Sequence, residues 1–327
     1  MCTAITYKGA NHYFGRNLDL EYSYNETVTV TPRNFPLKFR CFSEMTSHYA
    51  IIGTAIIEDN YPLYYDASNE KGLSAAGLNF PGNAAYMPFD GAMQNITPFE
   101  FIPWILGQCS TVSEAKSLLN NVNLVDINFN KKFPLTPLHW IIADKNSAIT
   151  VEAVGDGVKI YDNPVGVLTN NPTFDIQLFN LNNYISLSSE NPENTFSDKI
   201  PLTLYSRGMG GLGLPGDLSS SSRFVRAAFT KLNAAAESTE KASVGQFFHI
   251  LSTVAHTKGC VKVGEKYEIT VYSSCCNTDK GIYYYTTYEN QAITAVDMHK
   301  ENLDANVLIS YPFIKEQKIT MQNEKNM

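Results

Sequence analysis

Apolar positions in the first 80 residues form short runs typical of β-strands, separated by polar turns. The run at 27–31 is wholly β-branched, the run at 49–57 is largely apolar, and 72–79 is rich in small residues. Small side chains let neighbouring strands pack closely. This part of the chain is therefore predicted to form strands joined by turns.

Two helices are predicted next, each from a capping box. The first begins at Thr97, where Pro98 takes the first helical position and Glu100 closes the box, and it continues to residue 106. The second covers 112–121, with Thr111 as its cap and Glu114 three residues later. Both are expected to follow the strand-rich segment directly.

The remaining elements alternate in blocks. Strands are predicted at 138–144, 148–154, 158–161 and 165–169, helices at 174–186, 222–236 and 244–256, and further strands at 268–274, 281–288 and 292–297. The order of these elements is strands, a helix pair, strands, helices and strands again. This order favours an α+β fold whose two-sheet core carries helices on its outer faces. Because no repeat or linker divides residues 1–327, we expect a single domain.

The second residue carries unusual chemistry. Removal of Met1 leaves Cys2 at the N-terminus. Such a residue combines a thiol, whose reference pKa is about 8.5, with an α-amino group of pKa about 7.7 to 8. The amino group can serve as the base that an internal cysteine obtains from a neighbouring histidine. Cys2 is thus a candidate nucleophile, although small residues are also common at this position because they favour methionine removal.

The residues after Cys2 strengthen that hypothesis. Strand-like residues 3–7 and 12–14 flank a turn at 8–11, and Arg16 and Asp19 follow. If the two runs pair as a hairpin, both charged residues lie near Cys2. An arginine near a thiol favours the thiolate, and a carboxylate can orient an α-amino group. An ordinary cross-strand ion pair is the alternative interpretation.

Several motifs, in order along nearly the whole chain, resemble the choloylglycine hydrolase family. They are the Met1-Cys2-Thr3 start, Gly15-Arg16-Asn17-Leu18-Asp19, Asn69-Glu70-Lys71-Gly72-Leu73, Gly77-Leu78-Asn79-Phe80-Pro81, Gly166-Val167-Leu168-Thr169-Asn170-Asn171-Pro172, and Gly213-Leu214-Pro215-Gly216-Asp217 through Ser222-Arg223-Phe224. Within the family the chain is most similar to the conjugated bile salt hydrolases of gut bacteria. The resemblance implies the four-layer αββα sandwich of the N-terminal nucleophile hydrolases.

The resemblance also implies roles for particular residues. Asn79 and Asn170 would stabilise the oxyanion of a tetrahedral intermediate, and Arg223 would anchor the site through charge-assisted hydrogen bonds. With Cys2, Arg16 and Asp19 they make up the expected catalytic set. Each residue also has a structural interpretation. An asparagine near a proline often only forms a turn, and Arg223 could be a surface residue on the first turn of a helix.

The expected substrate is a glycine- or taurine-conjugated bile acid. Apolar and aromatic side chains in the surrounding loops could line a cleft for the steroid, because burial of its rings would supply most of the binding energy. These candidates are Leu18, Tyr22, Tyr65, Phe133 and Leu138. Arg207 is a hypothetical partner for the taurine sulfonate. Penicillin V acylase activity is the nearer alternative, and by resemblance Asn79, where those relatives tend to have tyrosine, favours bile salts.

Composition excludes some classes of protein. A net charge of -7 and a pI near 5.4 disfavour nucleic-acid and anionic-membrane binding, because no basic stripe exists. No segment approaches the roughly 20 apolar residues of a membrane span, and no secretory signal is recognisable, so we expect a cytoplasmic protein. The cysteine spacing suggests no zinc site, and no cofactor is expected. Cysteines other than Cys2 are predicted to be reduced structural thiols.

The region 187–221 is irregular and rich in Ser, Asn, Pro and Gly. By composition it is a surface loop. By resemblance it is the extension through which family members form tetramers, so a homotetramer is expected. The alternative to an enzyme is a non-catalytic binding protein, in which Cys2 is structural or Met1 is retained.

Overall fold

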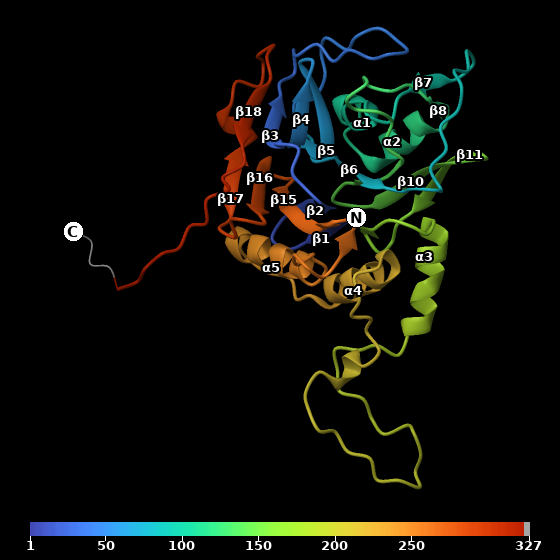
Figure 1. Ribbon diagram of the computed structural model, residues 1–327, viewed down its shortest axis with the longest axis vertical. Helices are drawn as coiled ribbons and strands as arrows, with labels where there is room; N and C mark the ends of the chain where they lie inside the picture. Colours follow the sequence, from blue (N-terminus) through green and yellow to red (C-terminus); the bar gives the residue numbers. More distant parts are fainter. Residues whose placement is uncertain (324–327) are drawn as a thin grey trace.

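The N-terminal hairpin is the centre of a six-stranded sheet in the computed structural model, which describes residues 1–323 (Figure 1). β1 (Cys2–Lys8) pairs antiparallel with β2 (His12–Leu20), which confirms the predicted hairpin. The strand order is β12-β1-β2-β15-β16-β17. The other members are β12 (Val167–Leu168), β15 (Ile269–Asn277), β16 (Ile282–Thr287) and β17 (Thr294–Asp297).

Close contact between β2 and β15 requires a glycine just before Arg16. A Cβ atom added to Gly15 would lie 2.0 Å from the carbonyl oxygen of Ser274. No side chain can occupy that space without moving the backbone of β15. The glycine of this motif therefore lets β2 carry Arg16 in the middle of the sheet.

A second sheet of eight strands lies against the first. Its order is β11-β10-β9-β6-β5-β4-β3-β18. The members are β3 (Thr27–Thr31), β4 (Ile51–Glu58), β5 (Tyr61–Asn69), β6 (Ser74–Asn79), β9 (Leu138–Ala143), β10 (Ala148–Val154), β11 (Gly157–Asp162) and β18 (Ile309–Pro312). The edge strand β18 was not predicted, because only four residues pair there and their pattern is short.

Helices cover the outer faces of both sheets (Figure 1). α4 (Ser220–Asn233) and α5 (Glu240–Ser252) pack on the six-stranded sheet, whereas α1 (Phe101–Gln108) packs on the eight-stranded sheet with α2 (Val112–Leu119) beside it. This arrangement confirms the expected four-layer αββα sandwich. Within residues 1–323 no helix has both the length and the hydropathy to cross a membrane.

Two clusters of buried side chains hold the layers together. One fills the space between the sheets and continues beneath α4 and α5, with Phe14, Leu78 and Phe247 among its members. The other lies under α1, where the rings of Phe101 and Trp140 stack with centroids 4.3 Å apart. Burial of these apolar surfaces is the main source of folding free energy.

The predicted start of the first helix was wrong. α1 begins at Phe101, and the preceding residues form a turn in which the Glu100 carboxylate accepts hydrogen bonds from the backbone N–H groups of Thr97 and Arg40. The Thr97 hydroxyl has no hydrogen-bond partner within residues 1–323, so the box is only half formed. In α2 the cap is as predicted, because the Thr111 side chain accepts a hydrogen bond from the N–H of Glu114.

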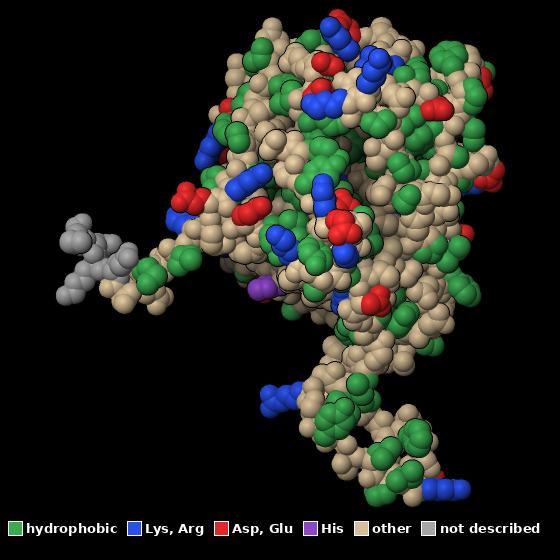
Figure 2. Space-filling model, in the orientation of Figure 1, with side chains coloured by type: hydrophobic (Ala, Val, Ile, Leu, Met, Phe, Trp, Pro, Cys, Tyr) green, Lys and Arg blue, Asp and Glu red, His purple; other side chains and the backbone are tan. Residues whose placement is uncertain are grey.

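Much of the predicted extension 187–221 lies away from the sandwich, following α3 (Phe174–Asn180) and a 3-10 turn, Leu181–Tyr184 (Figure 1). Its last residues return to the sandwich, because Ser220 already begins α4 and its hydroxyl accepts the N–H of Asn170. Figure 2 shows hydrophobic side chains along this extension. Its exposed apolar residues include Phe196, Ile200, Leu202, Leu204, Tyr205 and Leu212. The other short elements are β7 (Gln94–Ile96) with β8 (Val122–Leu124), β13 (Lys262–Val263) with β14 (Lys266–Tyr267), and 3-10 turns at Met209–Gly211 and Met298–Lys300.

Candidate active site

Cys2 is the first residue of β1 and is 3% exposed. It pairs with Leu18, and Ala4 pairs with Arg16, so these four side chains share one face of the sheet. That face is turned toward the eight-stranded sheet, because the Arg16 guanidinium bonds to backbone carbonyls of β5 and β6. Asp19 has the opposite parity, so its side chain lies on the face covered by α4 and α5.

Asn170 holds the backbone nitrogen of Cys2. That N–H donates to Asn170 Oδ1 at 2.9 Å, and the same oxygen accepts a hydrogen bond from Arg223 Nη2 at 2.7 Å. The Asn170 side-chain amide donates to the backbone carbonyl of Asn79 at 2.7 Å. One asparagine therefore connects the candidate nucleophile, the candidate anchoring arginine and the second candidate oxyanion residue.

Arg223 fixes the first two strand residues from α4. Its Nη1 donates to the carbonyl of Cys2 at 2.5 Å and to Thr3 Oγ1 at 2.6 Å, and its Nε donates to the carbonyl of Leu218 at 3.0 Å. Burial lowers the pKa of this guanidinium, against the opposing effect of Asp19. Arg223 is thus a buried anchor and not a surface residue.

Arg16 is also fully buried. Its Nη1 donates to the carbonyls of Tyr65 at 2.9 Å and Gly77 at 2.6 Å, whereas Nη2 has no hydrogen-bond partner among the described residues. Burial alone would lower the pKa of Arg16, but nearby negative groups, with Cys2 the strongest, raise it. The guanidinium therefore places a positive charge on the face of the sheet that also carries the Cys2 side chain.

The Asp19 side chain does not touch the nitrogen of Cys2. Its Oδ1 accepts a hydrogen bond from Thr270 Oγ1 at 2.6 Å, and Oδ2 lies 3.8 Å from His256 Nε2. The other ring nitrogen of His256 is 3.3 Å from Glu268 Oε1, which also binds the Met1 α-ammonium at 2.6 Å. With Met1 in place, its α-ammonium also donates to the backbone carbonyl of Asp19. The expected contact between Asp19 and the freed amino group of Cys2 stays a prediction.

The sequence reasoning missed His256 and Glu268, because no local motif marks either residue. With Asp19 they could place three ligand atoms within 4.8 Å of one another. The two ring nitrogens of His256 face different carboxylates, however, which fits a bridging imidazole better than a metal ligand. Although burial opposes ionisation, His256 and the Met1 α-ammonium hold the pKa of Glu268 below its ordinary value.

An apolar cavity of about 310 Å³ adjoins Arg16. Tyr65 and Gly77, whose carbonyls bind the guanidinium, are part of its lining, as are Phe133 and Leu138. Three of the five predicted apolar candidates are therefore brought together. Tyr24 also lines the cavity and lies 6.4 Å from Phe133, ring centroid to centroid, but was not predicted.

The other proposed substrate contacts lie elsewhere. Leu18 is packed in the core, because its strand position turns it inward between the sheets. Tyr22 is 45% exposed and does not line the cavity, although its hydroxyl forms a hydrogen bond with that of Tyr24, which does. Arg207 is exposed on the extension and forms no side-chain hydrogen bond with a site residue described here. These three side chains do not line the cavity within one chain.

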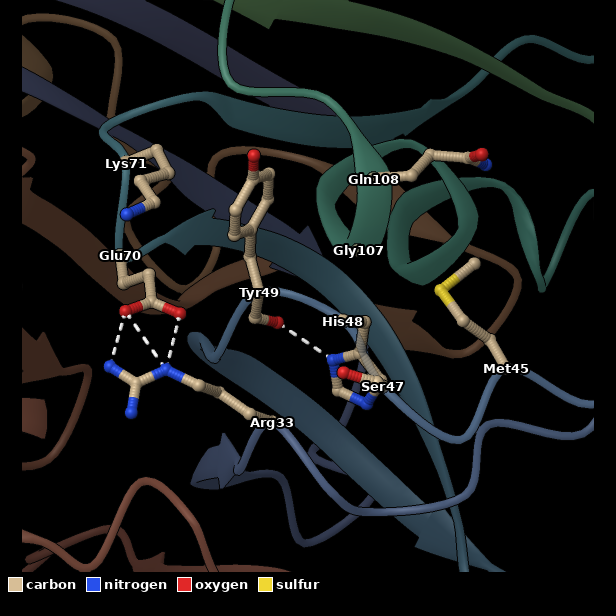
Figure 3. A pocket seen from close by; sticks show the side chains of 9 residues that line it. All are labelled: Arg33, Met45, Ser47, His48, Tyr49, Glu70, Lys71, Gly107 and Gln108. Atoms are coloured by element: carbon tan, nitrogen blue, oxygen red, sulfur yellow. Dashed lines mark hydrogen bonds and ion pairs between the residues drawn. The ribbon is translucent and has the colours of Figure 1, made fainter.

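A larger hollow of about 760 Å³ lies at a different place and shares no lining residue with the Cys2 site (Figure 3). There Arg33 pairs with Glu70 at 2.6 Å, and Lys71 lies 5.4 Å from the centre of the Tyr49 ring. Both ring nitrogens of His48 bond to backbone carbonyls. The Arg33–Glu70 pair and the His48 contacts are therefore made within the fold, which fits a structural role.

The remaining cysteines differ from Cys2 in environment. All six thiols are free. Burial raises the pKa of Cys109 and of Cys276 to about 12, and it also raises the pKa of Cys275. Since the thiolate is the reactive form, these three buried thiols are poor nucleophiles. Of the buried cysteines, Cys2 alone lies beside the arginines of the site.

Comparison with known proteins identifies the family. The profile described as linear amide C-N hydrolases, choloylglycine hydrolase family, matches residues 2–311. The bile salt hydrolase/transferase of Lactiplantibacillus plantarum is 61% identical over 317 residues, which cover 97% of this chain and 98% of that protein. The bile salt hydrolase/transferase of Clostridium perfringens is 42% identical and covers 99% and 100%, respectively.

Solved structures agree with the sequence match. A crystal structure of a variant of conjugated bile acid hydrolase from Clostridium perfringens has a TM-score of 0.91 at 42% identity and covers 98% of this chain and all of that one. Penicillin V acylase from Agrobacterium tumefaciens, at 21% identity, shares the fold, with a TM-score of 0.74 over 94% of this chain and 90% of that one. The chain belongs to the choloylglycine hydrolase family, the linear amide C–N hydrolases.

Proposed function

We propose that this hydrolase cleaves the amide bond of glycine- and taurine-conjugated bile acids, such as glycocholate and taurocholate. The observation that carries the proposal is the 61% identity, over nearly both full lengths, to a protein named bile salt hydrolase/transferase. The cavity beside Arg16 supports it, because aromatic and aliphatic side chains suit a rigid apolar acyl group.

The steroid would occupy the cavity with its amide toward Cys2. Tyr24, Tyr65, Phe133 and Leu138 provide apolar walls, and burial of the ring system against them would contribute most of the binding free energy. The glycine or taurine portion would then lie outside the cavity. Arg207 is exposed and does not line the cavity, so its contact with the sulfonate stays a prediction.

Catalysis begins after Met1 is removed. The freed nitrogen of Cys2 would become an α-amine held by Asn170 Oδ1, where it accepts the thiol proton. The thiolate attacks the amide carbon, so a carbon–sulfur bond forms and the carbonyl electron pair moves to oxygen. Collapse breaks the carbon–nitrogen bond, and the α-ammonium gives its proton to the leaving amine.

Water completes the cycle. The α-amine takes a proton from water, the hydroxide equivalent attacks the thioester, and the carbon–sulfur bond breaks to release the bile acid and restore the thiol. In both half-reactions the oxyanion would be stabilised by Asn79 and Asn170. Arg16 would favour the thiolate, Arg223 would hold the strand end, and Asp19 would act with His256 from the opposite face.

The test of this function is a substrate comparison. Protein confirmed by intact mass to begin at Cys2 is assayed for release of glycine from glycocholate and taurine from taurocholate, beside hydrolysis of penicillin V. We expect rapid turnover of at least one bile salt conjugate and weaker turnover of penicillin V. Turnover of penicillin V alone would overturn the acyl-group assignment, and no turnover of any amide would support the binding-protein alternative.

The extension is proposed to join four copies into a homotetramer. Its exposed apolar residues, including Phe196 at 79% and Tyr205 at 81% exposure, are costly in water and would be covered by a neighbouring subunit. We expect a Phe196→Ser, Tyr205→Ser double variant to lose the tetramer in light scattering, whereas Phe89→Ser, an exposed residue outside the extension, keeps it. A double variant that remains tetrameric would contradict this assignment.

The cytoplasmic location of the protein stays a prediction.

A further inference from the structure

A buried histidine–glutamate pair lies directly behind the two candidate oxyanion residues. His139 on β9 and Glu152 on β10 are paired across the sheet, and both are 0% exposed. His139 Nδ1 is 3.1 Å from Glu152 Oε1. Neither side chain touches Cys2 or lines the acyl cavity, and the reaction steps described above do not use them. Burial of such a pair is costly, so its position in the fold needs a reason.

The imidazole contacts both segments that carry the asparagines. Its Nε2 lies 2.9 Å from the carbonyl oxygen of Thr169, the residue before Asn170. Its ring stacks on Phe80, the residue after Asn79, with centroids 4.2 Å apart and planes inclined by 8°. His139 itself pairs with Leu78 across β9 and β6. One ring therefore touches the neighbours of both asparagines.

The hydrogen bonds fix the orientation of the ring. A carbonyl oxygen can only accept, so Nε2 must carry a proton toward Thr169. Nδ1 faces the Glu152 carboxylate at 3.1 Å. The same carboxylate oxygen accepts the backbone N–H of Phe174 at 3.0 Å, where α3 begins after the segment that holds Asn170. Rotation of the ring would break both of its bonds and the stack.

The two asparagines are also joined to each other. The Asn170 side-chain amide donates to the Asn79 carbonyl at 2.7 Å, and the neighbouring Asn171 amide donates to the carbonyl of Pro81 at 2.7 Å. A shift of either segment would therefore change the distance between the two oxyanion donors. Oxyanion stabilisation depends on donors that are placed before the reaction begins.

We propose that His139 and Glu152 are positioning residues, which hold Asn79 and Asn170 at the separation that the oxyanion requires. This inference rests on the proposed oxyanion roles of the two asparagines. The pair acts mainly on those donors and not on the thiol, since pairing with β2 and the Arg223 hydrogen bonds hold Cys2 independently of Asn170. Loss of the pair should slow the chemical step and leave ground-state binding in the cavity nearly unchanged.

The test compares His139→Gln and Glu152→Gln with His48→Gln. His48 is a matched control because it is buried, bonds through both ring nitrogens and lies at the other hollow. Both pair variants are expected to lower kcat by about tenfold to a hundredfold, the effect of misplacing catalytic groups by about 1 Å. Their KM should stay near wild type, and His48→Gln should keep the wild-type kcat per folded molecule.

Alkylation of Cys2 by iodoacetamide distinguishes displacement of the oxyanion donors from a loss of reactivity of the Cys2 thiol. That reaction forms no oxyanion, so its rate per folded protein should fall much less than kcat in the two pair variants and stay at the wild-type value in His48→Gln. Equal losses in alkylation and turnover, or an unchanged kcat in both pair variants, would overturn the proposal. Thermal melts establish the folded fraction in each sample.

A readout without turnover keeps this test independent of the proposed substrate. In protein labelled at asparagine side chains, the Asn79 and Asn170 amide resonances should shift in His139→Gln and remain in place in His48→Gln. Unmoved resonances in His139→Gln would overturn the positioning role. Failure of the wild type to hydrolyse bile salts would instead contradict the proposed function, and the same kcat ratios are then measured on the amide that it does cleave.

Discussion

Replacement of Cys2 by alanine is expected to reduce kcat for amide hydrolysis by more than about ten-thousandfold, as removal of a nucleophile does in other hydrolases. The residue begins β1 with its thiol on the face that carries Arg16, and its nitrogen is held by Asn170. Without sulfur no acyl intermediate can form. Release of glycine or taurine from conjugated bile acids measures the loss.

Two further variants sharpen this result. Cys2→Ser keeps the size of the side chain but offers a hydroxyl that Arg16 cannot readily ionise, so it should also be nearly inactive. Cys260→Ser removes an exposed thiol and should retain wild-type activity. Substantial turnover by Cys2→Ala, with the N-terminus confirmed by mass, would refute the nucleophile assignment.

Replacement of Asn170 by alanine is expected to lower kcat by about a thousandfold. One oxyanion donor alone contributes about a hundredfold to a thousandfold, and this side chain also holds the nitrogen that acts as the base. The variant further removes a partner of Arg223 and the link to Asn79. Single-turnover acylation kinetics would locate the loss in the first half-reaction.

Asn171→Ala is the matched control for this variant. Asn171 is the next residue and donates its side-chain amide to the carbonyl of Pro81, but it does not bind Cys2 or Arg223. Its replacement removes only the link to Pro81, so acylation should slow far less than in Asn170→Ala. Equal losses at the two positions would mean that the segment matters only for folding, and the role assigned to Asn170 would fail.

Local patterns predicted most of the secondary structure. The β-branched run of β3 and the capping residue of α2 were located correctly, because hydrogen bonds within a few residues decide them. The start of α1 was misplaced, since Glu100 bonds to the backbone of Arg40, sixty residues away, as well as to Thr97. Pairing of β18 with β3 likewise depends on a distant partner.

The candidate site shows the same difference between features decided locally and features decided by distant partners. The sequence by itself determined the hairpin that places Arg16 diagonally from Cys2, because a short turn sets the register of two adjacent strands. Family motifs added Asn79, Asn170 and Arg223 as candidates, without their contacts.

Only the tertiary structure decided which residues meet around Cys2. The backbone N–H and carbonyl of Cys2 are joined to Asn170 and Arg223 by hydrogen bonds that span 168 and 221 residues of chain. His139, Glu152, His256 and Glu268 carry no sequence signal, because a side chain that acts through strand pairing or through another layer needs no particular neighbour in sequence. The stacking of two sheets brings these distant positions together, and the periodicity of each strand cannot encode that stacking.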